Sequence, residues 1–213
     1  MRKTNVRPRG LAWGLGALAL TGCATFGTNA EKVAAEQLIS TDQENQLGLQ
    51  VKNELEQKEH IRYIIDAPVV GYVTDVANKV IAFGKKDRPD VQWQVHVIDD
   101  AKTVNAFATP GGYLYVYSGL LLAADNEAEL AGVMAHETGH VVARHSARSM
   151  VTEYGLNAVT SMVLGQNPGL LGQIASGIAT KGVLLSHSRS DETEADEYGA
   201  SIRRRRDTIR MAS

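Results

Sequence analysis

Two histidines four residues apart have the type and spacing to hold a metal ion in this sequence. They are His136 and His140 in the segment His136-Glu137-Thr138-Gly139-His140, which lies within an apolar run. On an α-helix, residues four apart project from one face, about 40° from each other. Two imidazoles at this spacing can share one Zn²⁺, and Glu137 can reach a water on the open side of the ion. The segment therefore predicts a helix that carries a hydrolytic zinc site.

A zinc site of this kind needs a third protein ligand from elsewhere in the chain. A third histidine six residues after the second is excluded, because the glycine and histidine of that pattern are replaced by Ala143 and Ser146. On a continuing helix His145 would point about 180° away from His136, which favours a packing or surface role. Cys23 is the single cysteine, so a thiolate cluster is also excluded.

The better candidate for the third ligand is Glu192, in the acidic segment 192–196. Glu192 and Asp196 are four residues apart on an expected helix that Ser190 would cap, so they share a face. Asp196 could then accept a hydrogen bond from the outer N–H of a ligating histidine, as metal-bound imidazoles usually require. Glu194 would project about 200° from Glu192 and be solvated. Taken alone, this acidic stretch would instead indicate an exposed helix start.

The elements that must position these residues predict an α+β fold that is mostly helical. Apolar residues recur at helical spacing in most of the body, and alternate with a period of two around residue 94. Turn residues at 110–112 separate two short strands. The expected elements are a helix from Ser40 or Thr41, a helix over 68–84, strands over 91–97, 104–108 and 113–117, a helix capped by Asp125 or Asn126 that runs through the histidine pair to about Met150, and the helix of the acidic segment.

Charged residues in the first half of the body indicate its solvent-facing surfaces. Glu44 is placed for a capping box at the start of the first helix, whose wet side would carry the glutamates Glu44, Glu54, Glu56 and Glu59. The run 85–90 reads as a solvated loop. Residues 154–180 hold no charge, and the break at 166–169 favours two short buried or interfacial helices over a membrane hairpin.

The first residues resemble a targeting segment. A basic start precedes an apolar stretch of ten residues, which is too short to span a bilayer, and Leu20-Thr21-Gly22-Cys23 looks like a bacterial lipobox. We expect residues 1–22 to be a lipoprotein signal peptide, Cys23 to be lipidated, and 23–40 to be a tether. Without the signal the chain has 18 basic and 24 acidic residues, and this acidic balance does not suggest a nucleic-acid partner.

Four motifs, in order, resemble the M48 family of zinc metalloendopeptidases, a gluzincin group, over about residues 40–200. They are Val104-Asn105-Ala106-Phe107 with Pro110-Gly111-Gly112, Asn126-Glu127-x-Glu129-Leu130-Ala131, the histidine pair, and Ser188-Arg189-x-x-Glu192-x-Glu194-Ala195-Asp196. The resemblance implies a zincin-like metalloprotease domain over 41–202, with a small three-stranded sheet beside the helix of the histidine pair. It also implies one zinc per chain, held by His136, His140 and Glu192, with Glu137 as catalytic base and Asp196 as partner of His136.

With the lipobox, the resemblance is greatest to the outer-membrane lipoprotein branch, which faces the periplasm. We therefore expect a zinc endopeptidase that cleaves unfolded or misassembled envelope proteins, anchored through Cys23. An extended substrate could add to the edge of the strand over 104–108. Arg189, or less strongly His187, could donate a second hydrogen bond to the oxyanion. The alternatives are a catalytically weak, chaperone-like binding module for outer-membrane proteins and a lipid-anchored scaffold with a structural zinc.

The last residues depart from the family pattern. After Ala200 the family continues with an amphipathic helix, whereas here four arginines, Arg203 to Arg206, follow in a row. Such a run cannot form the apolar face of a core helix. We expect 203–213 to be an atypical basic tail, which indicates a shortened C-terminal region or a basic end that contacts anionic lipid headgroups.

Overall fold

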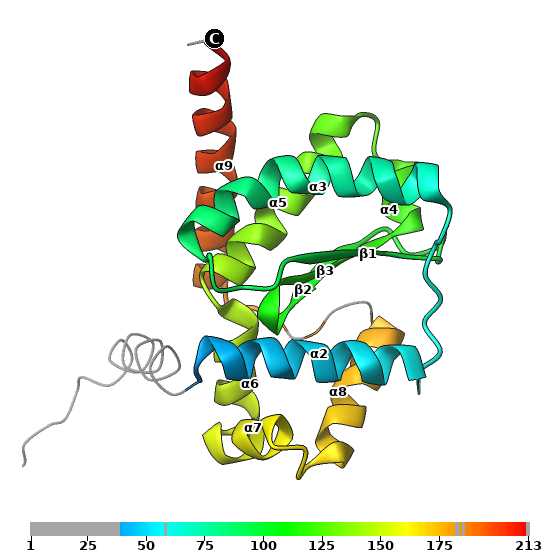
Figure 1. Cartoon of the computed structure of the whole chain (residues 1–213), viewed down its shortest axis with the longest axis vertical. Helices are drawn as coiled ribbons and strands as arrows, with labels where there is room; N and C mark the ends of the chain where they lie inside the picture. The colour runs from blue at the N-terminus through cyan, green and yellow to red at the C-terminus, as the bar shows by residue number, and fades with distance from the viewer. Residues whose placement is uncertain (1–38, 58, 182–183, 185, 212–213) are drawn as a thin grey trace, which may run out of the picture.

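The computed structural model describes residues 39–57, 59–181, 184 and 186–211 (Figure 1). The expected signal peptide, the lipobox cysteine Cys23 and nearly all of the tether lie outside these residues. The described elements are α2 (Thr41–Gln57), α3 (Ala67–Asp87), β1 (Gln94–Ile98), β2 (Ala106–Thr109), the 3₁₀ turn η1 (Pro110–Gly112), β3 (Tyr113–Tyr117), α4 (Ser118–Ala123), α5 (Glu127–Val142), α6 (His145–Tyr154), α7 (Leu156–Val163), α8 (Pro168–Lys181) and α9 (Arg189–Met211).

The three strands form one mixed sheet in the order β1-β3-β2, which confirms the predicted α+β fold with a small sheet. β1 pairs with β3 in parallel, and β2 pairs with β3 in antiparallel, from Ala106 opposite Val116 to Thr109 opposite Tyr113. β3 is buried along its whole length, as a central strand covered on both faces should be. β2 is left at an edge of the sheet, beside α5.

Helices cover both faces of the sheet (Figure 1). The tyrosines of β3, among them Tyr115, face a core that α2, α7 and α8 complete, while Leu114 and Val116 face a second core formed with α3 and α5. His96, a polar residue of the alternating segment around residue 94, lies on the same face of the sheet as these tyrosines. His96 on that face stacks against Tyr63 and Tyr115, with ring centroids 5.1 and 5.3 Å away. Burial lowers the pKa of His96.

The first helix begins as predicted, but its capping box and its glutamates differ. Gln43, not Glu44, closes the box, because its side-chain oxygen accepts from the backbone N–H of Ser40. Glu44 is 1 % exposed, and its carboxylate pairs with Arg88 at 3.2 Å and with Arg144 at 2.9 Å. The expected solvated loop is also wrong in part, since residues 85–87 finish α3 and the Arg88 side chain is mostly buried.

The helix of the histidine pair does not continue to Met150 as predicted. Asn126 caps it as expected, but α5 ends at Val142 and α6 starts at His145. Between them Arg144 has φ 57°, the left-handed region that a residue with a side chain rarely adopts. Contacts from α2 and from the residues just before it hold Arg144 there: Arg144 donates to Glu44 and to the backbone carbonyl of Ile39. The kink is a product of tertiary contacts and has no glycine or proline to announce it.

The uncharged stretch forms two short helices, as predicted. α7 and α8 bury Val159, Met162, Ile174 and Ile178 in the core that they share with α2. Among the described residues we find no helix with the length and apolarity needed to cross a membrane.

The acidic helix α9 is capped by Ser188 rather than by Ser190. The Ser188 hydroxyl accepts from the N–H of Asp191, and the Asp191 carboxylate accepts from the N–H of Ser188, which is a reciprocal capping box. α9 then runs without interruption to Met211, so the arginines from Arg203 onward extend the same helix. Arg205 lies 3.7 Å from the carboxylate of Asp87 at the end of α3.

Candidate metal centre

α5 and α9 lie side by side, and this crossing brings the two predicted halves of the site together. A glycine allows the close approach. A Cβ atom at Gly139 would lie 2.9 Å from the Cα of Ala195, too close for any larger residue without movement of α9. Gly139 lies in the helical turn between His136 and His140, and Ala195 lies in the turn between Glu192 and Asp196. The backbone contact therefore places the histidines opposite the carboxylates.

Nitrogen and oxygen atoms of His136, His140 and Glu192 converge on one point. The two Nε2 atoms are 2.9 Å apart, and the Glu192 carboxylate lies 3.4 Å from Nε2 of His136 and 3.8 Å from Nε2 of His140. In a tetrahedral zinc site with bonds near 2.0 Å, the ligand atoms are about 3.3 Å apart. Two imidazoles and one carboxylate are also a usual set for zinc. These three side chains fit the ion in number, type and spacing.

Asp196 lies where the sequence predicted it, behind His136. Its Oδ1 atom is 2.8 Å from Nδ1 of His136, so the carboxylate accepts the ring's Nδ1–H. This bond keeps the lone pair of Nε2 directed at the ligand group.

Glu137 lines the same cavity and has an altered acidity. Burial raises the pKa of Glu137 to about 8, and the negative charge of Glu192 adds to the rise. A hydrogen bond from the backbone N–H of Ala108, in β2, opposes it. A cation beside this carboxylate would favour its charged form. Glu137 therefore accepts a hydrogen bond from Ala108 on the edge strand β2, and its negatively charged neighbour is Glu192 on α9.

The cavity around these residues measures about 310 Å³ and lies between β2, α5 and the start of α9. Ala106, Phe107 and Ala108 of the edge strand form part of its wall, so an extended chain that pairs with β2 would pass the histidines. His187 lines the cavity and stacks on His140, with ring centroids 4.1 Å apart. Arg189 is exposed and is not among the lining residues. Of the two expected oxyanion donors, the structure places His187 nearer.

His145 is the residue whose position the sequence did not reveal. The kink at Arg144 turns it back toward the site, so its Nδ1 lies 2.8 Å from Nδ1 of His140. It is fully buried, which agrees with a packing role, but the predicted direction away from the histidine pair was wrong. Burial lowers the pKa of His145 to about 4 and that of His140 to about 3.

Glu194 is exposed, as predicted, but it also has partners that the sequence did not indicate. Its Oε2 lies 3.2 Å from Nε2 of His145 and 3.6 Å from Arg148. Asp191 joins the same group, 2.7 Å from Arg148. The kink between α5 and α6 places His145 and Arg148 on that side of α9.

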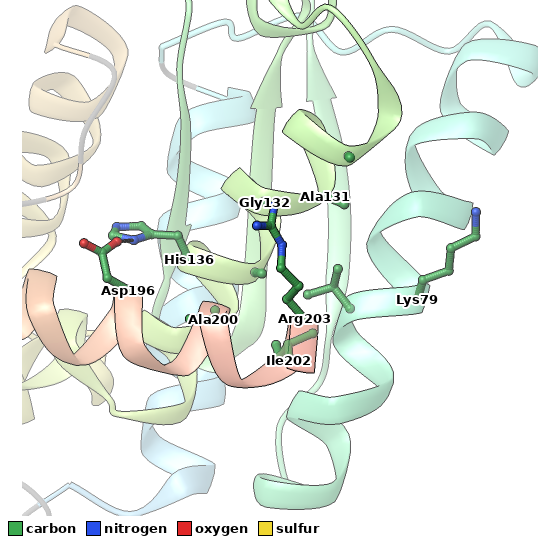
Figure 2. A pocket seen from close by; sticks show the side chains of 12 residues that line it. Lys79, Ala131, Gly132, His136, Asp196, Ala200, Ile202 and Arg203 are labelled. Carbon is green, nitrogen blue, oxygen red and sulfur yellow. Dashed lines mark hydrogen bonds and ion pairs between the residues drawn. The ribbon is translucent and has the colours of Figure 1, made fainter. Parts of the chain in front are cut away.

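A second, apolar pocket of about 280 Å³ lies between α3, α5 and α9 (Figure 2). Small residues of the two crossing helices, such as Ala131, Gly132 and Ala200, form much of its wall. His136 and Asp196 stand at one end, so His136 lines both this pocket and the metal cavity.

Fold and site together define a metallopeptidase organised around the helix of the histidine pair. The model of peptidase family M48 matches residues 70–212, and the chain belongs to this family. This confirms the predicted resemblance at the level of the family.

Relatives from bacteria and from mitochondria match most of the chain. The mitochondrial metalloendopeptidase OMA1 of Schizosaccharomyces pombe is 33 % identical over 93 % of this chain and 59 % of its own length. The metalloprotease LoiP of Escherichia coli is 32 % identical over 89 % of this chain and 76 % of its own. The beta-barrel assembly-enhancing protease of Yersinia pestis is 27 % identical over 90 % and 43 %. The chain thus spans between about two fifths and three quarters of the length of these relatives.

Proposed function

We propose that the chain is a zinc-dependent endopeptidase that cleaves unfolded or misassembled proteins of the bacterial cell envelope, in the periplasm. The convergence of His136, His140 and Glu192 on one point is the observation that carries the proposal. We assign these three as the zinc ligands, Glu137 as the catalytic base and Asp196 as the residue that orients His136. Family membership supports peptide hydrolysis, and the name of the Yersinia pestis relative, a beta-barrel assembly-enhancing protease, supports a role at the envelope.

The chemistry follows from where each side chain lies. A zinc ion held by the three ligands would supply Lewis-acid chemistry, activating a water and polarising the scissile carbonyl. Glu137 takes the proton of that water and passes it to the leaving amine, which requires its charged form at the start of the cycle. Ala108 N–H holds the Glu137 carboxylate in place. His187, at the wall of the cavity, is our candidate for a second donor to the oxyanion.

The edge strand β2 supports a substrate that is locally unfolded. Only an extended segment can pair with a strand edge, and such pairing reads the backbone more than the side chains. Lipidation at Cys23, and through it attachment to the outer membrane, rests on the lipobox pattern alone. It would hold the domain at the membrane surface.

The test is cleavage of an unfolded protein such as casein by the purified full chain. We expect about one zinc per molecule by elemental analysis, cleavage that a chelator abolishes, and recovery when zinc is restored. A chain that carries zinc, binds casein and never cleaves it would contradict the proposal and support a chaperone-like binding module instead.

A further inference from the structure

A line of hydrogen-bonding groups runs from the second ligand histidine to the far side of α9. His140 Nδ1 is 2.8 Å from Nδ1 of His145, and His145 Nε2 is 3.2 Å from Oε2 of Glu194. His145 has no exposed surface, so its ring nitrogens cannot turn to water for partners. Each contact of this line is within hydrogen-bonding distance, and all three side chains come from different elements: α5, α6 and α9.

The protons along this line have one consistent arrangement. Nε2 of His140 faces the ligand group, so its neutral ring carries the proton on Nδ1. That N–H can donate only to a lone pair, which places the proton of His145 on its Nε2. The His145 Nε2–H then donates to the Glu194 carboxylate. Every donor meets an acceptor, which no other assignment of the two neutral rings achieves.

We propose that His145 is a positioning residue of the metal site, which accepts a hydrogen bond from His140 and fixes the tautomer and ring orientation of that ligand. The inference rests on the proposed zinc site. It makes the two ligands unequal: His136 is oriented by a carboxylate directly, and His140 by a neutral imidazole that a carboxylate holds in turn. Outer partners of metal ligands commonly contribute 10–100-fold in affinity, roughly the effect expected here.

The group of His145, Asp191 and Glu194 could itself be mistaken for a second metal site, because its ligand atoms lie within 4.8 Å of one another. The guanidinium of Arg148 already pairs with the two carboxylates of that group. Arg148 lies 2.7 Å from Asp191 and 3.6 Å from Glu194, and its side chain is 9 % exposed. A second cation beside this buried charge would be repelled. The arrangement fits a network that orients His145.

The kink between α5 and α6 is what brings His145 into contact with His140. On a straight helix, residue 145 would face away from His140. The left-handed backbone of Arg144 brings it back, and the pairing of Arg144 with the buried Glu44 holds that backbone in place. A residue with a side chain is strained in this region and persists there only where its surroundings enforce it.

Zinc affinity measured by competition with a chromogenic chelator tests the proposal without any peptidase assay. We expect His145→Leu to bind zinc about 10–100-fold more weakly than the wild type, because Nδ1–H of His140 loses its acceptor. His145→Asn, whose side-chain oxygen can take the place of Nδ1, should recover most of the loss. His96→Leu removes another largely buried histidine, in the core on the α2 side of the sheet, and should leave the affinity within about twofold.

Two further variants keep the test decisive if His145→Leu does not fold. Glu194→Ala, at a half-exposed site, should weaken zinc binding about threefold or more, while Glu197→Ala on the same helix should not. Normal zinc affinity in folded His145→Leu, or in Glu194→Ala, would overturn the positioning role. A wild-type chain that binds no zinc would overturn the proposed function itself, which is a distinguishable result.

Discussion

Glu137→Gln should remove nearly all peptidase activity from this chain while leaving its zinc in place. The amide has the shape of the carboxylate but cannot take a proton, so general-base catalysis, worth about 10²–10⁴-fold, is lost. The three ligands that we propose for the metal, His136, His140 and Glu192, are unchanged in this variant. Cleavage rate on casein and zinc content by elemental analysis are the two measurements. Glu153→Gln, at an exposed position on α6, is the control that should alter neither.

Although Glu137→Gln should lose activity, we expect it to gain stability when both proteins are measured without metal. Burial raises the pKa of Glu137 in the folded chain to about 8, from an ordinary value of 4.5. Between these values the folded state binds more protons than the unfolded state, so the free energy of unfolding falls as pH rises. The Gln variant has no such loss. In chelator we expect it to be more stable than the wild type at pH 8, with the difference vanishing toward pH 5.

The predicted loss of activity and the predicted gain of stability in Glu137→Gln can be contradicted separately. Casein cleavage at the wild-type rate by Glu137→Gln would reject the catalytic role. Equal urea midpoints of the two metal-free proteins at pH 8 would show instead that water or a counter-charge already compensates the buried carboxylate.

The contacts of the candidate site that the sequence could predict are those that regular helix geometry sets. The spacing of four residues needs only the helical period to place His136 beside His140, or Glu192 beside Asp196. The alternation of residues around residue 94, in β1, and the turn at 110–112 likewise predicted the small sheet. These features depend on neighbours along the chain, which a sequence displays directly.

What the sequence did not reveal depends on contacts between distant segments. The kink at Arg144 is held by Glu44, one hundred residues earlier, and no local residue type announces it. The direction of His145 followed from that single backbone conformation, so its contact with His140 was missed. Glu44 itself has the helical spacing of a surface glutamate, and only its pairing with two arginines explains its burial.

Removal of the carboxylate of Glu192 should have the largest effect on metal binding. Glu192→Ala leaves two imidazoles, which is one protein ligand fewer than catalytic zinc sites use, so zinc affinity should fall by more than the 10–100-fold typical of an outer partner. Asp196→Asn removes only the charge behind His136 and should fall within that range. Glu197→Ala, which is exposed on the same helix, should bind zinc normally. Chelator competition on all three proteins gives the order directly.

The order of these three affinities separates two ways in which this chain could hold an ion. If the ion lies between the histidine pair and α9, Glu192→Ala is the weakest binder. If it lies instead among His145, Asp191 and Glu194, whose atoms also converge, Glu192→Ala keeps its zinc and Asp191→Asn loses it. The second outcome would remove the ion from the reach of Glu137 and, with it, the basis for peptide hydrolysis. The ion pair of Arg148 with Asp191 is the physical reason to expect the first.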